Sequence, residues 1–205
     1  MTQAAHDPER RSRLLLCTGN PGKVTELKLL LPSSINLISL AEAGLPLDLP
    51  ETGETLEANA LQKAHFAHQR TDLPCLADDT GLEVAALNGA PGAYSARYAG
   101  AAKDAVANMR KLLHELHGAA DRTARFRTVI ALVTDGAEHT FEGVVNGTII
   151  EAPRGSGGFG YDPIFRPDGH ALTFAEMDLQ AKNTMSHRAM AMRAAADFLS
   201  NQPLR

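Results

Sequence analysis

The chain has 205 residues, 44% of them hydrophobic, which suits one sizeable core but is short for two ordinary domains. Its formal charge of -4 excludes the broad basic surface of a nucleic-acid binder, whereas a small polyanion needs only a local cluster of cations. No run approaches the roughly 18 apolar residues of a membrane span, and residues 1–12 lack the apolar stretch of a secretory signal. We expect a flexible leader over residues 1–12 and one cytoplasmic domain over residues 13–205.

The first part of the chain alternates apolar strands with amphipathic helices. We expect a buried strand at residues 14–18, a helix at 24–31 and a strand at 35–40. A loop rich in proline and glycine then leads to a helix at 55–70. Its apolar stripe consists of Leu56, Ala60, Ala64 and Ala67. This alternation is typical of an α/β fold.

The rest of the chain adds a predicted hairpin. We expect a strand at residues 75–77, a turn at 78–81, a short strand at 82–86 and a helix at 104–116. Residues 124–134 and 138–150 are β-branched and are joined by Asp135-Gly136, a hairpin signature that predicts a mixed sheet. A last helix at 186–200 buries Ala189, Met192, Ala196 and Leu199. Both cysteines, Cys17 and Cys75, are expected as buried reduced thiols because they lie in apolar runs.

A candidate anion site lies between the first predicted strand and the first predicted helix, where residues 18–23 read Thr-Gly-Asn-Pro-Gly-Lys. The amides and the positive dipole end of a helix start favour an anion. Lys23 is informative because a cation in the first turn opposes the dipole unless something negative is bound there. A bound phosphate would resolve this conflict. The alternative is an ordinary capped helix with a solvated lysine, because the P-loop spacing is absent.

Acidic residues indicate a metal site. Asp78-Asp79-Thr80-Gly81 directly follows a buried strand, at the kind of position where α/β sites usually form. Such oxygen ligands suit Mg²⁺, and one of the acids could orient a water molecule. The alternative is a turn in which Asp and Gly make local backbone bonds. Glu51 could join Asp79 on the metal, and Lys63 could either extend to solvent or reach a phosphate.

Two later segments carry further candidate contacts. Ser186-His187-Arg188 opens the last helix with two potential cations, and Lys182 adds a third upstream. A structural role is the alternative for His187. Residues 157–162 read Gly-Gly-Phe-Gly-Tyr-Asp, in which an aromatic ring can stack on a base and Asp162 can bond its edge. The alternative is a tight loop that buries Phe159 in the core.

Together, these segments resemble the inosine triphosphate pyrophosphatase family, whose members hydrolyse dITP, ITP and XTP. The resemblance runs from Leu14 to Leu199. It also rests on three further segments: Glu51-Thr-Gly, residues 57–60 (Glu-Ala-Asn-Ala) with Lys63, and residues 89–98 (Gly-Ala-Pro-Gly-Ala-Tyr-Ser-Ala-Arg-Tyr). Thr80 stands where the family often has serine, which keeps the hydroxyl group.

The resemblance implies an elongated α/β fold with a mixed β-sheet flanked by helices, and two lobes with a central nucleotide cleft. It also implies a Mg²⁺ cofactor, a homodimer, and purine nucleoside triphosphates as the small-molecule partners. Asp79 matches the general base and a metal ligand, and Glu51 matches the second metal ligand. The implied substrate contacts are Thr18, Gly19, Asn20, Pro21, Gly22, Lys23, Lys63, Thr80, Phe159, Gly160, Tyr161, Asp162, Lys182, His187 and Arg188.

Three other classes of function compete with this interpretation of the sequence. One is a Maf-like pyrophosphatase of modified pyrimidine nucleotides, and another is a sensor that binds a nucleotide without cleaving it. The third, an RNA-binding module, is disfavoured by the acidic balance and the few aromatic residues. Substrate profiling separates the first class, and binding without pyrophosphate release would identify the second.

Overall fold

The computed structural model describes residues 12–19, 24, 28, 31 and 33–202, and it contains one mixed sheet in the order β2-β1-β3-β4-β5-β6. The strands are β1 (Ser12–Leu16), β2 (Ile35–Ser39), β3 (Cys75–Val84), β4 (Thr123–Thr134), β5 (Ala137–Ile149) and β6 (Phe165–Pro167). β1 pairs in parallel with β2 and β3, whereas the pairs from β3 to β6 are antiparallel. The predicted hairpin and mixed sheet are therefore confirmed.

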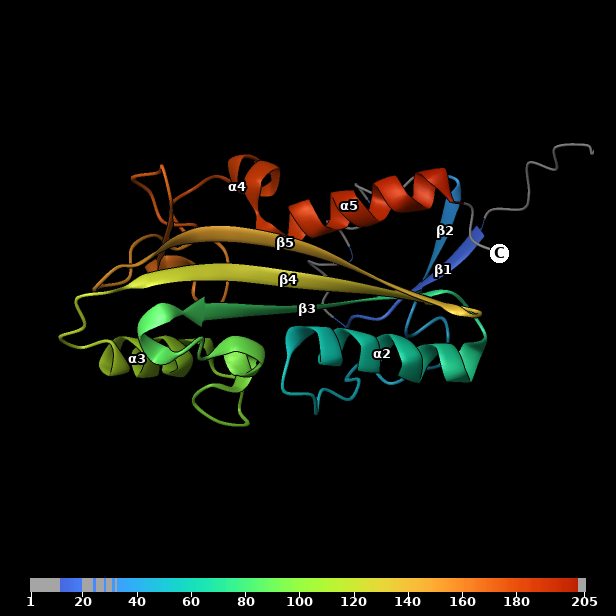
Figure 1. Ribbon diagram of the computed structural model, residues 1–205, viewed down its shortest axis with the longest axis horizontal. Helices are drawn as coiled ribbons and strands as arrows, with labels where there is room; N and C mark the ends of the chain where they lie inside the picture. Colours follow the sequence, from blue (N-terminus) through green and yellow to red (C-terminus); the bar gives the residue numbers. More distant parts are fainter. Residues whose placement is uncertain (1–11, 20–23, 25–27, 29–30, 32, 203–205) are drawn as a thin grey trace, which may run out of the picture.

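Helices cover both faces of the sheet (Figure 1). The helices α2 (Leu56–Thr71) and α3 (Ala105–Glu115) lie on one face, and α4 (Leu179–Met185) and α5 (His187–Asn201) lie on the other. Short 3₁₀ helices follow β3 and precede β6: η1 (Ala85–Leu87), η2 (Gly92–Arg97) and η3 (Asp162–Ile164). The elongated α/β fold is thus confirmed, while the two lobes stay a prediction. In the described part of the chain, no helix has the length and apolar character needed to cross a bilayer.

Two predicted segments lie largely outside the described residues. The leader expected at residues 1–12 is described only at Ser12, which begins β1, so the division into leader and domain stays a prediction. The helix expected at residues 24–31 is described only at Val24, Lys28 and Leu31.

The predicted apolar faces of the helices form the core. The stripe of α2 is buried against Val129, Ala131 and Val133 of β4, and the Thr55 side chain caps this helix by accepting from the Ala58 amide. The apolar face of α5 packs on the opposite side of the sheet, against Ile130 and Leu132. The four stripe residues of each helix are buried as expected. Both cysteines are buried free thiols, as predicted.

The turn predicted at residues 78–81 is wrong, because β3 continues through it. β4 pairs with β3 in register from Cys75–Val133 to Val84–Ala124, and this long ladder overrides the local turn preference of Asp and Gly. Gly81 instead permits a close approach, since a Cβ there would lie 2.9 Å from the Gly92 carbonyl carbon. The two acids therefore lie within a strand and point to opposite faces of the sheet.

The other edge of β3 opens soon after its start. β1 pairs with β3 only at Leu15–Cys75 and Leu16–Leu76 in the described residues. Beyond that point, a side chain forms a hydrogen bond with the backbone of this edge, since Lys63 Nζ donates to the Asp78 carbonyl at 2.7 Å. Consequently, a crevice can form along this edge, with side chains from both faces of β3 around it.

Tight backbone packing at Gly143 predicts a large effect of an added methyl group. A Cβ there would meet the His187 carbonyl oxygen and lie 2.7 Å from the Ala191 amide nitrogen, and backbone atoms cannot rotate away. We expect Gly143→Ala to lower the free energy of unfolding by about 3 kcal/mol. Urea denaturation measures this change. Asn146→Ala, exposed on the same strand, should change it by less than about 0.5 kcal/mol, and equal values for the two variants would contradict the packing.

Candidate active site

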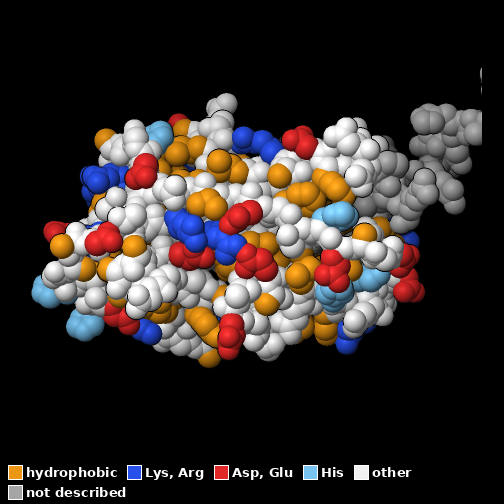
Figure 2. Space-filling view, viewed as in Figure 1, with side chains coloured by type: hydrophobic (Ala, Val, Ile, Leu, Met, Phe, Trp, Pro, Cys, Tyr) orange, Lys and Arg blue, Asp and Glu red, His pale blue; other side chains and the backbone are white. Residues whose placement is uncertain are grey.

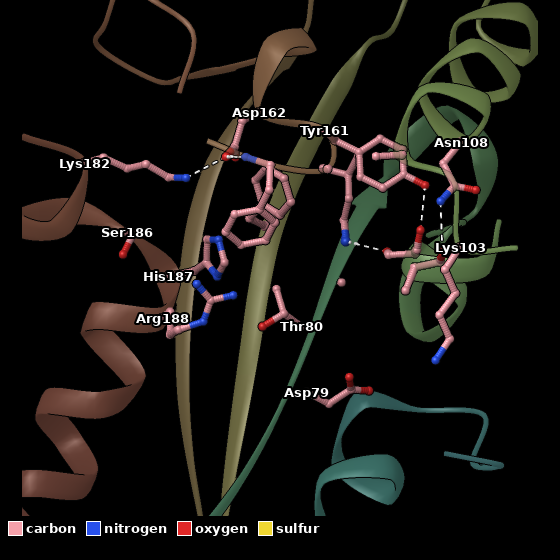
Figure 3. A pocket seen from close by; sticks show the side chains of 18 of the residues that line it. Asp79, Thr80, Lys103, Asn108, Tyr161, Asp162, Lys182, Ser186, His187 and Arg188 are labelled. Carbon is pink, nitrogen blue, oxygen red and sulfur yellow. Dashed lines mark hydrogen bonds and ion pairs between the residues drawn. The ribbon is translucent and has the colours of Figure 1, made fainter. Parts of the chain in front are cut away.

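A cavity of about 290 Å³ lies at the open edge of β3, between η2, the start of α3, the residue 159–162 loop and the start of α5 (Figure 3). Its walls include the predicted site residues Glu51, Asp79, Thr80, Phe159, Gly160, Tyr161, Asp162, Lys182, His187 and Arg188. A second cavity of about 530 Å³ has Thr18, Gly19 and Lys63 in its walls, and it shares Glu51 and Lys103 with the first. Residues 20–23 lie outside the described residues. The two cavities therefore adjoin at Glu51.

Lys63 brings the two predicted metal ligands together. Its Nζ atom lies 2.5 Å from Glu51 Oε1 and 3.6 Å from Asp79 Oδ1. Asn59, one helical turn earlier on α2, donates from Nδ2 to Asp79 Oδ2 at 3.1 Å. Because Asn59 and Lys63 lie on the same face of one capped helix, α2 fixes both the position and the charge balance of the Asp79 carboxylate.

The ammonium group of Lys63 stays charged at neutral pH. Burial lowers its pKa, but the nearby carboxylates of Asp79, Asp78 and Glu51 outweigh burial and raise the pKa above the ordinary 10.5. Because the pKa of Lys63 is higher in the folded state than in the unfolded state, its charge stabilises the fold fully at any pH below the ordinary lysine pKa. This contribution is lost only as the pH rises through the raised pKa of the folded protein. The two acids therefore face a fixed positive charge across the neutral range.

The donor set of Glu51 and Asp79 fits a hard divalent cation. Both carboxylates already converge on one positive group, and the crevice leaves room for further oxygen ligands from a phosphate. Within residues 12–19 and 33–202, no group of three or more His, Cys, Asp or Glu side chains could hold a metal by itself. A metal at this site would therefore depend on oxygens of the bound ligand.

Asp78 has a different environment from its neighbour. Its carboxylate is buried on the α5 side of β3, with Oδ2 3.7 Å from Arg188 Nε, whereas Asp79 points to the α2 side. Asp79 forms an ion pair with Lys63, which also pairs with Glu51. The expected pair of acids at a strand end is corrected to one acid on each face, because β3 does not turn.

Phe159 is the exposed aromatic residue of the glycine-rich loop. Its ring is 54% exposed, so the alternative of a core plug is wrong. Lys182 Nζ and Arg188 Cζ lie 5.1 and 5.3 Å from the ring centroid. Asp162 Oδ2 accepts from the Phe159 amide at 2.8 Å and from Lys182 Nζ at 2.6 Å, which fixes the loop against α4. This arrangement suits a flat ligand ring stacked on Phe159.

Tyr161 has the opposite role in that loop. It is buried in the core, where its hydroxyl group donates to the Ser95 carbonyl at 2.9 Å, and burial raises the pKa of its phenol. The ring therefore anchors the loop to η2, and only part of the residue reaches the cavity wall.

The start of α5 carries the expected cap and its neighbouring cations. Ser186 Oγ accepts from the Ala189 amide at 3.2 Å, so Ser186 caps the start of the helix and the first turn lies at the cavity. His187 is buried and stacks on Phe126, with the ring centroids 4.9 Å apart. Arg188 follows on the same helix turn. Arg188 thus places a cation in the first turn of the helix, against the dipole, and the Asp78 carboxylate lies 3.7 Å from its Nε atom.

Three residues at the site were given no role from the sequence. Asn59 holds Asp79, Arg97 Nη2 donates to the Glu51 carbonyl at 3.2 Å, and Lys103 lines both cavities with Nζ 3.3 Å from Asp48 Oδ1. The spacing of Asn59 and Lys63 by one helical turn could have indicated the first. Lys103 lies in an irregular loop with a positive φ of 53°, and no local pattern predicts its contact.

The crevice and its charges define an α/β protein built to hold a small anion with a flat ring at the edge of a mixed sheet. The chain belongs to the Ham1 family, whose model matches residues 14–198. It is 53% identical to a dITP/XTP pyrophosphatase of Porphyromonas gingivalis, over 91% of this chain and 97% of that protein. The resemblance seen in the motifs is therefore confirmed.

Solved structures agree with the fold. A HAM1 protein from Coxiella burnetii superposes with a TM-score of 0.88 at 42% identity, covering 93% of this chain and 100% of that one. The Staphylococcus aureus Ham1 protein superposes with a TM-score of 0.87 at 39% identity, covering 93% and 99%. The match therefore extends over the whole architecture that carries the crevice.

The buried position of Lys63 predicts that its charge supports the fold. Lys63→Met would leave Glu51 and Asp79 facing each other without their shared cation, so we expect the free energy of unfolding at neutral pH to fall by about 3 kcal/mol. Chemical denaturation measures this value. Lys111→Met is the matched control because Lys111 is exposed on α3, and it should cost less than about 1 kcal/mol. Equal losses in the two variants would refute the role given to Lys63.

Proposed function

We propose that the chain hydrolyses non-standard purine nucleoside triphosphates, namely dITP, ITP and XTP, to the monophosphate and pyrophosphate. The observation that carries this proposal is the convergence of Glu51 and Asp79 on one cationic position in the crevice that also exposes Phe159. The names of the relatives support the same substrates. These names disfavour the Maf-like alternative.

The proposed placement of the nucleotide is based on the positions of Phe159 and of the positively charged side chains. The base stacks on Phe159, near Lys182, His187 and Arg188, and the phosphates extend past Glu51 toward the second cavity. That cavity holds Thr18 and Gly19 together with Lys63. We also propose phosphate contacts from Asn20, Pro21, Gly22 and Lys23, which lie outside the described residues.

The residues present fit Mg²⁺, which Glu51 and Asp79 would hold together with phosphate oxygens. Bound Mg²⁺ would withdraw negative charge from those oxygens. Asp79 accepts a proton from the water that attacks the α-phosphorus, while Asn59 keeps the carboxylate oriented. The bond from the α-phosphorus to the bridging oxygen breaks, and pyrophosphate leaves with that oxygen. Lys63 offsets the negative charge that develops on the leaving pyrophosphate, and losing one such donor typically costs about 3 kcal/mol.

The resemblance also supports three proposals about the whole protein. We propose that it acts as a homodimer in the cytoplasm, with residues 13–205 forming one catalytic domain. Light scattering measures the mass, and limited proteolysis measures whether residues 1–12 are cleaved first.

Metal-dependent turnover is the first expected outcome. Wild-type protein should release pyrophosphate from dITP with Mg²⁺ and lose this activity with a chelator. Asp79→Asn should reduce kcat by roughly a thousandfold, because a neutral amide cannot accept the proton of the attacking water. Asp121→Asn is the control, since Asp121 is exposed and caps the Thr123 amide away from the crevice. Nucleotide binding without pyrophosphate release would instead identify the sensor.

Base selectivity is the second expected outcome. A site that donates to the 6-oxygen of hypoxanthine or xanthine leaves polar groups unpaired when adenine offers its amino group instead. We expect kcat/KM for dITP to exceed that for dATP by at least about a hundredfold. A pyrophosphate assay with both nucleotides measures this ratio, and equal values would contradict the proposed base contacts.

A further inference from the structure

Three side chains from three elements form a hydrogen-bonded chain at the cavity wall. Thr80 Oγ1 of β3 lies 2.8 Å from Thr128 Oγ1 of β4, which lies 2.6 Å from His187 Nδ1 of α5. Thr128 is 0% exposed and His187 is 4% exposed, so water cannot replace these bonds easily. Thr80 and His187 line the cavity (Figure 3), whereas Thr128 is not among its lining residues and reaches it only through its bonds to these two.

Other contacts already fix the position of the His187 ring. Phe126 stacks on it with an interplanar angle of 18°, and the α5 backbone rests on Gly143. Stacking does not distinguish the two flipped orientations of an imidazole, which exchange Nδ1 with a carbon atom. The bond from Thr128 does distinguish them, because it requires nitrogen at that position. Thr128 therefore determines which ring nitrogen remains for the cavity side.

The hydroxyl groups can also decide where the ring carries its proton. A neutral imidazole has one N–H donor and one acceptor nitrogen, and each threonine has one proton to donate. The helix start and the neighbouring Arg188 favour the neutral ring over a second positive charge. If Thr80 donates to Thr128 and Thr128 donates to Nδ1, the single ring proton lies on Nε2.

We propose that Thr128 is a positioning residue that holds His187 in the Nε2–H form, so that the ring donates a hydrogen bond to an oxygen of the nucleotide. The proposal rests on the proposed function for the identity of the ligand. A 6-oxopurine offers an acceptor to this donor, whereas the 6-amino group of adenine offers a second donor. Thr128 thereby contributes to base selectivity without touching the substrate.

The first test is spectroscopic and needs no nucleotide. ¹⁵N NMR of protein labelled in the histidine ring reports which nitrogen is protonated, and His187→Gln identifies the signal by its loss. At neutral pH, wild type and Thr128→Ser should both show the Nε2–H form of His187, because both keep the hydroxyl group. Thr128→Val, which has nearly the same shape, should show a mixture of the two forms. An Nδ1–H form in the wild type overturns the proposal.

The second test separates positioning from folding. Thr128→Val should raise KM for dITP about tenfold, with kcat within about twofold, because one hydrogen bond to the bound nucleotide is weakened. The ratio of kcat/KM for dITP to that for dATP should also fall about tenfold, and Thr128→Ser should restore both values to within about threefold of wild type. Equal losses in the serine and valine variants, or a fall in kcat alone, refute the proposal.

The two tests distinguish a failure of this proposal from a failure of the proposed function. If wild-type protein does not hydrolyse dITP, the proposed function fails, but the NMR signal of the ligand-free protein still decides the protonation of His187. If Thr128→Val does not fold, the wild-type and serine spectra still decide the protonation state, and the kinetic constants of Thr128→Ser still test whether the hydroxyl group suffices.

Discussion

The alternation of side chains along β3 is the constraint on which the site depends. Because β3 stays extended beside β4, Asp79 points toward α2 while Asp78 and Thr80 point toward α5. β1 leaves the other edge after Leu76, so a ligand at that edge can meet residues from both faces. A turn at these residues would have placed the acids together at the strand end and removed Thr80 from its contact with β4.

Charge compensation explains how an acidic chain maintains a cationic crevice. Lys63 pairs with Glu51, Lys182 pairs with Asp162, and Arg188 lies beside Asp78. Each of these three cations therefore has a carboxylate close by, which offsets the cost of removing it from water. An incoming polyanion can share these cations, and a divalent metal on the released carboxylates would balance the added negative charge.

The sequence predicts the parts of the fold that depend on local patterns. The helical spacing of apolar residues and the capping residues identify α2 and α5, and Asp135-Gly136 identifies the hairpin. Each of these patterns involves residues that are close to one another in the sequence. The ordered motifs also identify the family and most of the cavity wall. The turn at residues 78–81 fails because its local preference competes with a ladder whose partners lie about fifty residues away in the chain. Lys103 has no local signal because its contact is set by how two loops meet.

Thr128 has a polar contact that the local sequence pattern does not predict. It lies in Thr-Val-Ile-Ala-Leu, an apolar strand segment in which a valine would fill nearly the same volume and bury no hydroxyl group. A buried hydroxyl group costs free energy unless it is bonded, and Thr128 meets this cost through its bonds to Thr80 and His187. Threonine in place of valine adds little to the stability of the sheet, since contacts at Phe126 and Gly143 already fix the position of α5. The polar residue is therefore better explained by the ring that it orients than by the core that it occupies.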